Sequence, residues 1–135
     1  MITRDEAYAL LKQHIPDAAL VAHCVESEAV LGALARRLGK DEALWSLTGL
    51  LHDLDYATTK DNHARHGLDS ADLLDGKLPE EAITAIRAHN GEHTGVAPAT
   101  DLDFALRCGE TVTGLIHPAA LVRPTRLEGM EAKGL

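Results

Sequence analysis

The chain has 135 residues, of which 45% are apolar and 25% are charged, a balance typical of one soluble globular domain over residues 1–135. Its 21 Asp and Glu outnumber its 13 Lys and Arg, which gives a net charge of −8, and only 3% of its residues are aromatic. Binding of a nucleic-acid polymer requires clustered cations and benefits from stacking rings, so we expect no such partner.

The N-terminus and the cysteines bear on the cellular compartment. The first residues contain no apolar core of a signal peptide, and no apolar run approaches the ~20 residues of a membrane span. Two cysteines, Cys24 and Cys108, form no disulfide framework. We therefore expect a cytoplasmic protein without a membrane partner. A homodimer stays open, and Met130 and Leu135 are the only apolar residues near the C-terminus that hint at it.

Ala and Leu dominate the chain while Val and Ile runs are scarce, which favours helix almost everywhere. Thr3 and Glu6 form a capping box at the start of the first predicted helix, and Gly39 and Asn90-Gly91 are helix stop signals. Helices are predicted, in chain order, over residues 4–14, 17–38, 41–55, 64–74, 79–89, 102–116 and 118–122. The fold predicted is all-α, a compact orthogonal bundle of about six to seven helices.

Several histidines and carboxylates fall on the apolar faces of these helices: His23, the pair His52-Asp53, His89 and Glu110. A single buried histidine is most often a core residue with a satisfied hydrogen bond. Several together in one small domain are costly unless they pair or bind an ion. Imidazole and carboxylate suit a divalent transition metal ion, such as Mn, Fe, Zn, Co or Ni.

The ordered set resembles the HD superfamily of metal-dependent phosphohydrolases, and in particular its small bacterial members of the HDIG type. The segment Leu50–Tyr56, LLHDLDY, resembles the family signature of an HD pair between apolar residues. His66-Gly67 with Ser70–Leu74, the segment ending in Ala88-His89-Asn90, and Thr113–Ile116 resemble later family motifs. The resemblance covers residues 20–124.

The resemblance implies which residues hold metal and substrate. His23, His52, Asp53 and Glu110 would bind a first ion. His66 and His89 would bind a second ion bridged by Asp53, or would contact substrate phosphate if one ion binds, so Asp53, His66 and His89 are the expected catalytic residues. A small phosphorylated substrate would be hydrolysed by metal-activated water. Glu110 stands where the family usually has Asp, which leaves the activity open.

Cations are needed for the substrate phosphate. Lys60 and Arg65, close to His66 in the sequence, and Arg123, after the sixth helix, are the candidates for this role. An ordinary solvated cation is the alternative for each of them.

Other functions compete with the phosphohydrolase. One is an inactive HD module that binds metal or nucleotide as a regulatory domain, and another is a helical interaction protein with structural histidines. His89-Asn90-Gly91-Glu92-His93 also matches the H-x-x-E-H string of inverse zinc peptidases. That mechanism needs both histidines on one continuous helix, which Asn90-Gly91 would break.

Overall fold

The computed structural model describes residues 1–135 and contains eight α-helices, one 3-10 turn and no strands, in agreement with the predicted all-α class. In chain order the elements are α1 (Arg4–His14), α2 (Ala18–Leu38), α3 (Glu42–Leu51), α4 (Tyr56–Thr59), α5 (Leu68–Leu74), α6 (Glu80–His89), α7 (Gly91–Thr94), α8 (Asp101–Leu121) and η1 (Ala132–Gly134).

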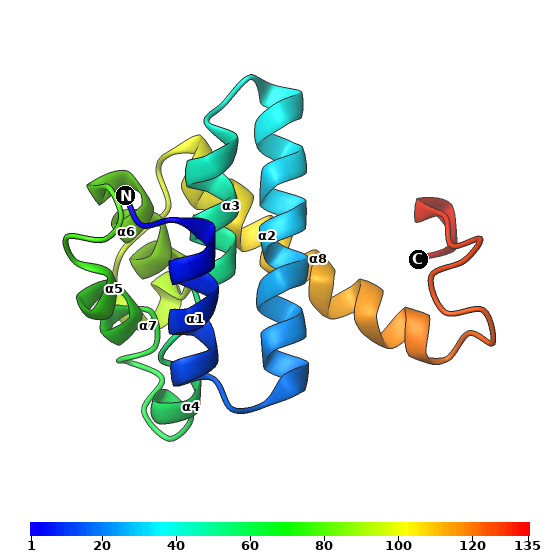
Figure 1. The fold of residues 1–135 in the computed structure, drawn as a ribbon, viewed down its shortest axis with the longest axis horizontal. Helices are drawn as coiled ribbons and strands as arrows, with labels where there is room; N and C mark the ends of the chain where they lie inside the picture. Colours follow the sequence, from blue (N-terminus) through cyan, green and yellow to red (C-terminus); the bar gives the residue numbers. More distant parts are fainter.

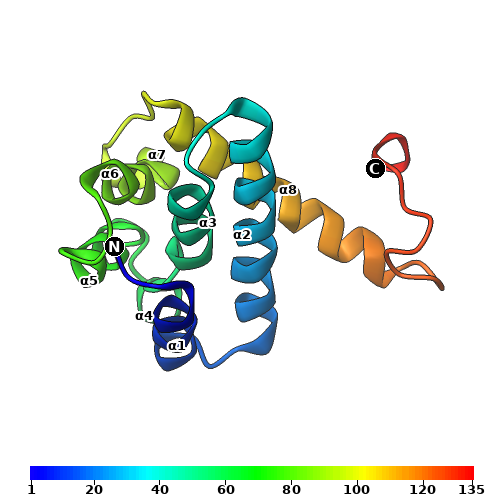
Figure 2. The same ribbon diagram turned by 45° about the horizontal axis from the view of Figure 1, so that its top comes forward.

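Helix α3 is the central element. It packs against α1, α2, α6 and α8, and Leu50 and Leu51 at its C-terminal end are fully buried. Helices α2 and α3 run side by side, while α5 and α6 lie on the other side of α3 (Figures 1 and 2). The C-terminal end of α3 therefore lies where α2, α5, α6 and α8 approach one another.

Helix α2 is long and apolar enough to cross a membrane by length and composition alone, so the expectation that no run approaches that length is wrong. Core helices meet the same criterion. Here α2 packs against α3 and α8, and Cys24, Leu31 and Ala35 on its inner face are fully buried.

The predicted helix ends hold where capping chemistry is explicit. The Thr3 and Glu6 capping box is present, and Gly39 ends α2 with a left-handed φ of 65°. They fail around the middle of the chain. Helix α3 ends at Leu51 instead of residue 55, and the short helix α4 lies between residues 55 and 64, where no helix is predicted. Helix α5 begins at Leu68 instead of residue 64.

Gly67 explains the late start of α5. Its φ of 92° is unfavourable for any other residue, and a Cβ there would lie 2.9 Å from the Ile86 carbonyl oxygen and 3.3 Å from Cε1 of His89. The glycine therefore allows the chain to pass directly against the end of α6.

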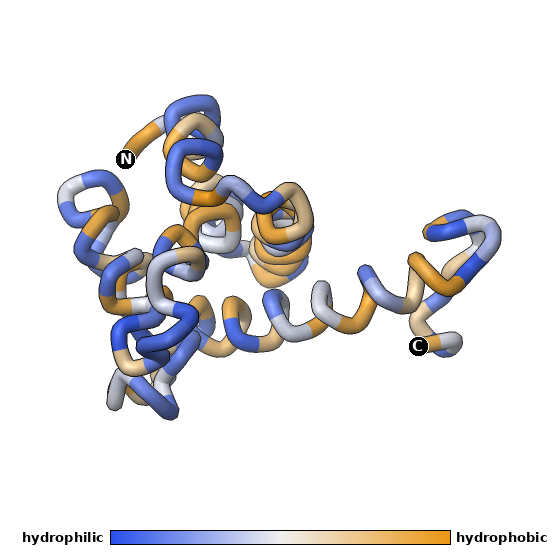
Figure 3. Tube along the Cα trace, turned by 90° about the horizontal axis from the view of Figure 1, so that it is seen from below, coloured by the Kyte–Doolittle hydropathy of each residue, from blue (hydrophilic) through white to orange (hydrophobic).

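Helix α8 was expected to end near residue 116 before a short helix over residues 118–122, but it continues through Pro118 to Leu121. Proline removes the hydrogen bond to the carbonyl of Gly114, and Gly114 is exposed, so water can take that place. This part of α8 and residues 122–135 project away from the bundle (Figures 1 and 3). Leu121, Val122 and Leu127 are exposed there. The homodimer stays a prediction.

Candidate metal centre

Five segments bring histidine and carboxylate side chains to one pocket. His23 comes from the N-terminal third of α2, His52 and Asp53 follow α3, His66 precedes α5, and His89 ends α6. Glu110 approaches from α8. The pocket has a volume of about 360 Å³ and is lined by Leu20, His23, Asp53, Tyr56, His66, His89, Asn90 and Glu110.

The first donor group consists of His23 Nε2, His52 Nε2 and Asp53 Oδ2. The two histidine nitrogens are 3.3 Å apart, and Asp53 Oδ2 lies 3.4 Å from His23 Nε2 and 3.3 Å from His52 Nε2. Nitrogen and oxygen ligands bind divalent transition metals at roughly 2.0–2.2 Å, which separates neighbouring ligand atoms by about 3.0–3.5 Å. The three atoms of the first donor group therefore have the spacing of ligands around one cation.

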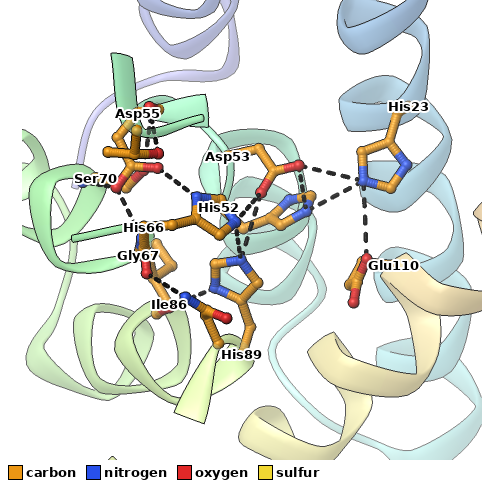
Figure 4. Close-up of polar contacts among 12 residues, drawn as sticks. His23, His52, Asp53, Asp55, His66, Gly67, Ser70, Ile86, His89 and Glu110 are labelled. Carbon is orange, nitrogen blue, oxygen red and sulfur yellow. Dashed lines mark hydrogen bonds and ion pairs between the residues drawn. The ribbon is translucent and has the colours of Figure 1, made fainter. Parts of the chain in front are cut away.

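The second donor group uses the other oxygen of the same carboxylate, with His66 Nε2 and His89 Nε2. Asp53 Oδ1 lies 3.3 Å from His66 Nε2 and 3.4 Å from His89 Nε2, and the two nitrogens are 3.1 Å apart. Figure 4 shows Asp53 between the two pairs of histidines. Its carboxylate is placed so that it could bridge two ions, and both groups are sets of side chains that could hold a metal ion.

The outer ring nitrogens are held by groups that accept hydrogen bonds. His52 Nδ1 donates to the Gly49 carbonyl at 2.8 Å, and His89 Nδ1 donates to the Ile86 carbonyl at 2.5 Å. A carbonyl cannot donate, so the neutral rings must carry their proton on Nδ1. Each Nε2 then presents its lone pair to the pocket, which is the tautomer that a metal ligand requires.

Asp55 fixes His66 in the same way. Asp55 Oδ1 accepts a hydrogen bond from His66 Nδ1 at 2.7 Å, while Oδ2 accepts from the backbone N–H of Gly67 at 2.7 Å and of Ser70 at 2.8 Å. The Asp55 amide in turn donates to the Ser70 hydroxyl at 3.0 Å. One buried carboxylate thus orients the imidazole and anchors the segment that carries it.

Thr113 holds His23. Its hydroxyl donates to the Glu110 carbonyl at 2.7 Å and lies 2.9 Å from His23 Nδ1. Because the hydroxyl proton is used by that carbonyl, the oxygen accepts from Nδ1, and Nε2 of His23 again faces the pocket with its lone pair.

The pKa values of the buried groups reflect this crowding. Burial alone would raise the pKa of Asp53, but the neighbouring His52 and the close approach of His23 and His66 outweigh it and hold this pKa well below its usual range. Burial alone would lower the pKa of His66, but hydrogen bonds to Asp53 and Asp55 raise it to about 10. Without a metal, the site therefore combines an Asp53 carboxylate with a protonated His66 at neutral pH.

Glu110 lies at the edge of the first donor group. Its Oε2 is 4.0 Å from His23 Nε2, farther than the 3.3 to 3.4 Å that separates the other three atoms. It lines the pocket and its side chain remains 29% exposed. Glu110 is therefore close enough to reach a cation or its water by a small rotation.

The three expected phosphate-binding cations lie in different surroundings. Lys60 lines a smaller pocket that shares Tyr56 and His66 with the metal pocket. Arg65 pairs with Asp69 and Asp72 at the surface. Arg123 lies beyond α8, where its guanidinium donates to the carbonyls of Arg126 and Glu128. Neither arginine lines the metal pocket.

The H-x-x-E-H string does not form one ligand face. Helix α6 ends at His89, and the separate helix α7 carries His93. His93 Nδ1 bonds the side-chain oxygen of Asn90 at 3.0 Å and faces the ring of His63 instead of the metal pocket. The break at Asn90-Gly91 thus separates the two histidines.

Three residues that support the site, Asp55, Thr113 and Asn90, are not among those that the sequence patterns predict. Asn90 donates to the carbonyls of His63 and His66 at 2.8 and 3.0 Å, so it fixes the backbone of the segment before α5. The sequence feature that could have indicated them is their closeness to the predicted ligands: Asp55 lies within the LLHDLDY segment, Asn90 follows His89, and Thr113 is one turn after Glu110.

A family model of the HD domain matches residues 20–123. Two curated relatives are named ribonuclease Y: that of Oleidesulfovibrio alaskensis is 30% identical over 95 residues, and that of Campylobacter jejuni subsp. doylei is 32% identical over 101 residues. These alignments cover 70% and 74% of this chain but only 18% and 19% of the relatives, so the chain spans about a fifth of their length. No solved structure shows significant similarity. The resemblance predicted from the ordered histidines and carboxylates is confirmed, and the chain belongs to the HD domain family, whose members are generally metal-dependent hydrolases.

Proposed function

We propose that this protein hydrolyses a phosphate ester of a small molecule with the help of one or two divalent transition metal ions. The observation that carries the proposal is the sharing of Asp53 between the two donor groups, with its two oxygens 3.3–3.4 Å from four histidine nitrogens. A carboxylate that bridges two cations suits phosphoryl chemistry, because attacking and leaving oxygens can be stabilised together.

The two donor groups would hold divalent ions, which would supply hydroxide near neutral pH by lowering the pKa of bound water and would neutralise charge on the phosphoryl oxygens. The chain's own residues hold the donor atoms in place through Gly49, Ile86, Asp55 and Thr113. In the reaction the water oxygen forms a bond to phosphorus and the ester P–O bond breaks. The leaving oxygen takes a proton that the attacking water gives up, so a phosphate monoester yields an alcohol and phosphate, and a phosphodiester yields an alcohol and a phosphate monoester.

The charge of the chain favours a small substrate. A net charge of −8 repels a long polyanion, whereas a single phosphate group meets only the local field of the pocket. The name of the two relatives points to phosphodiester cleavage, so an RNA dinucleotide belongs in the substrate panel.

The test combines metal content with turnover. The protein is purified without chelator, its metals are measured by elemental analysis, and it is assayed with nucleoside monophosphates, a chromogenic phosphodiester and an RNA dinucleotide. We expect one to two transition metal ions per chain and hydrolysis that stops on chelation and returns with metal. Metal binding without hydrolysis of any ester would overturn the proposal of an enzyme and favour a regulatory HD module. Absence of both would favour a helical interaction protein.

A further inference from the structure

A smaller pocket adjoins the metal pocket and differs from it in chemistry. It has a volume of about 190 Å³ and is lined by Tyr56, Thr59, Lys60, His63 and His66, and we call it the Lys60 pocket. Tyr56 and His66 line both pockets. The Lys60 pocket and the metal pocket are therefore adjacent along the side chains of Tyr56 and His66.

The Lys60 pocket is the only one of the five surface pockets without a carboxylate in its lining. The other four contain Asp53 and Glu110, Asp69 and Asp72, Glu26, or Asp101. Lys60 is also the only lysine or arginine that lines any of the five. In a protein with a net charge of −8, an anion therefore meets the least repulsion in this pocket.

Lys60 has no carboxylate partner. Seven of the 13 lysines and arginines pair with an Asp or Glu, and Lys60 is not one of them. Its ammonium lies 6.0 Å from the centre of the Tyr56 ring, at the outer limit of a cation–π contact, which keeps the charge beside the pocket. All three donors of the ammonium remain available to a ligand.

The remaining lining is also suited to an anion. The Thr59 hydroxyl is used within the chain, since it donates to the Asp55 carbonyl at 2.8 Å. The Tyr56 hydroxyl and the His63 ring, by contrast, belong to none of the side-chain hydrogen bonds of the surrounding segment. Three donor groups on Tyr56, Lys60 and His63 thus share one pocket with no competing acceptor side chain.

We propose that the Lys60 pocket binds a second phosphate group, so that the substrate carries two phosphates: one is hydrolysed beside Asp53 and the other is held by Lys60. This inference rests on the proposed phosphohydrolase. It narrows the substrate to the class of nucleoside diphosphates, nucleoside bisphosphates and similar doubly phosphorylated esters. A charge-assisted contact of this kind contributes roughly a tenfold preference or more.

The first test keeps the nucleoside constant and varies the phosphates. The metal-loaded protein is assayed with adenosine 5′-monophosphate, adenosine 5′-diphosphate and adenosine 3′,5′-bisphosphate. We expect kcat/KM for the better doubly phosphorylated compound to exceed that for the monophosphate by about tenfold or more. A ratio near one for both compounds would overturn the second phosphate site.

Variants assign the preference to Lys60. The substitution Lys60→Met keeps the length of an exposed side chain and removes its charge, so we expect the preference ratio to fall close to one, while Lys60→Arg retains part of it. Lys12→Met, at an exposed lysine on α1 that lines no pocket, should leave the ratio unchanged. An unchanged ratio in Lys60→Met would overturn the assignment of the second phosphate to Lys60. A loss only in Tyr56→Leu would overturn it too, because it would indicate that the base occupies the pocket.

The second test does not depend on turnover. Inorganic phosphate is titrated into the metal-free protein while backbone amide resonances are recorded. We expect shifts centred on Tyr56, Lys60 and His63 that disappear in Lys60→Met. Shifts elsewhere, or no shifts, would contradict the pocket even if the protein hydrolyses esters. Shifts at these residues in a protein without any esterase activity would instead mean that only the proposed function has failed.

Discussion

The two donor groups share Asp53 but are built from different kinds of structure. In the first group, His52 follows the central helix α3 and is fully buried, and His23 lies in the N-terminal third of α2. In the second group, His66 lies in the turns between α4 and α5, where no regular helix supports it. Helix packing positions His23 and the turn that carries His52, whereas hydrogen bonds accepted by Asp55 and donated by Asn90 position the segment that carries His66.

This difference teaches where the site is sensitive to substitution. A side chain on a packed helix keeps its direction when one polar partner is lost, because its backbone is held by many apolar contacts. A side chain on a turn depends on a few specific hydrogen bonds. We therefore expect single polar substitutions to weaken metal binding at the second donor group more than at the first.

The largest effect is expected from Asp53, which belongs to both groups. Asp53→Asn removes the charge that would bridge two cations, so we expect loss of both metal ions and a fall in turnover of about a thousandfold or more. Elemental analysis and the hydrolysis assay measure both effects. Asp61→Asn, at an exposed carboxylate that lines no pocket, is the matched control. Retention of one tightly bound ion in Asp53→Asn would refute the shared ligand.

A second prediction separates the groups through Asp55. In Asp55→Asn the amide oxygen can still accept hydrogen bonds from Gly67 and Ser70, but the amide nitrogen faces His66 Nδ1 and can only donate to it. The neutral His66 ring then carries its proton on Nε2. We expect affinity at the second donor group to fall by roughly 10–100-fold while the first is retained. Calorimetric metal titration gives the two affinities, and nitrogen NMR of His66 in the metal-free protein gives the tautomer. Equal weakening of both ions would show that Asp55 supports only the fold.

A third prediction concerns pH. The pKa of His66 is raised to about 10 from 6.5, so the metal-free protein holds a proton on this ring at pH 7, and an ion in the second donor group must displace it. Affinity there should rise about tenfold per pH unit between pH 7 and 9. The stability of the metal-free protein depends on pH in the opposite direction. The contribution of His66 to its free energy of unfolding is complete below pH 6.5 and is lost as the pH rises toward 10. Titrations in two buffers of different ionisation enthalpy count the released proton, and the absence of release would contradict the assignment.

The smallest effect is expected at Thr113. Thr113→Val keeps the shape of this buried side chain but removes the acceptor for His23 Nδ1, and α2 still holds the ring. Affinity at the first donor group should fall by about tenfold or less. Thr111→Val, on the exposed face of α8, controls for the loss of a helix hydroxyl. A loss as large as that of Asp55→Asn would remove the distinction between packed and hydrogen-bonded support.

Much of the fold was predictable because helix signals are local. Capping residues such as Thr3 and Gly39 act within one turn, and apolar periodicity placed His23 and His89 on inward faces. The order of these histidines and carboxylates was enough to predict the HD family.

The segment from residue 52 to 67 could not be predicted in the same way. Its conformation depends on Asp55 bonding groups 11 to 15 residues further along the chain, and on the close approach of Gly67 to Ile86. Such contacts leave no periodic pattern, so Asp55 was placed inside a helix. The turns there place the two carboxylates at opposite nitrogens of the His66 ring, with Asp53 beside Nε2 and Asp55 on Nδ1.

The sharing of a single carboxylate has an electrostatic consequence. Only Asp53 and Glu110 contribute negative charge to the lining of the metal pocket, and the histidine ligands are neutral when they bind metal. Two divalent cations would therefore leave a local excess of positive charge in an otherwise acidic molecule. Metal loading would reverse the sign of the electrostatic potential at the entrance of the metal pocket. The ions that would activate water would therefore also attract an anionic ligand from solution.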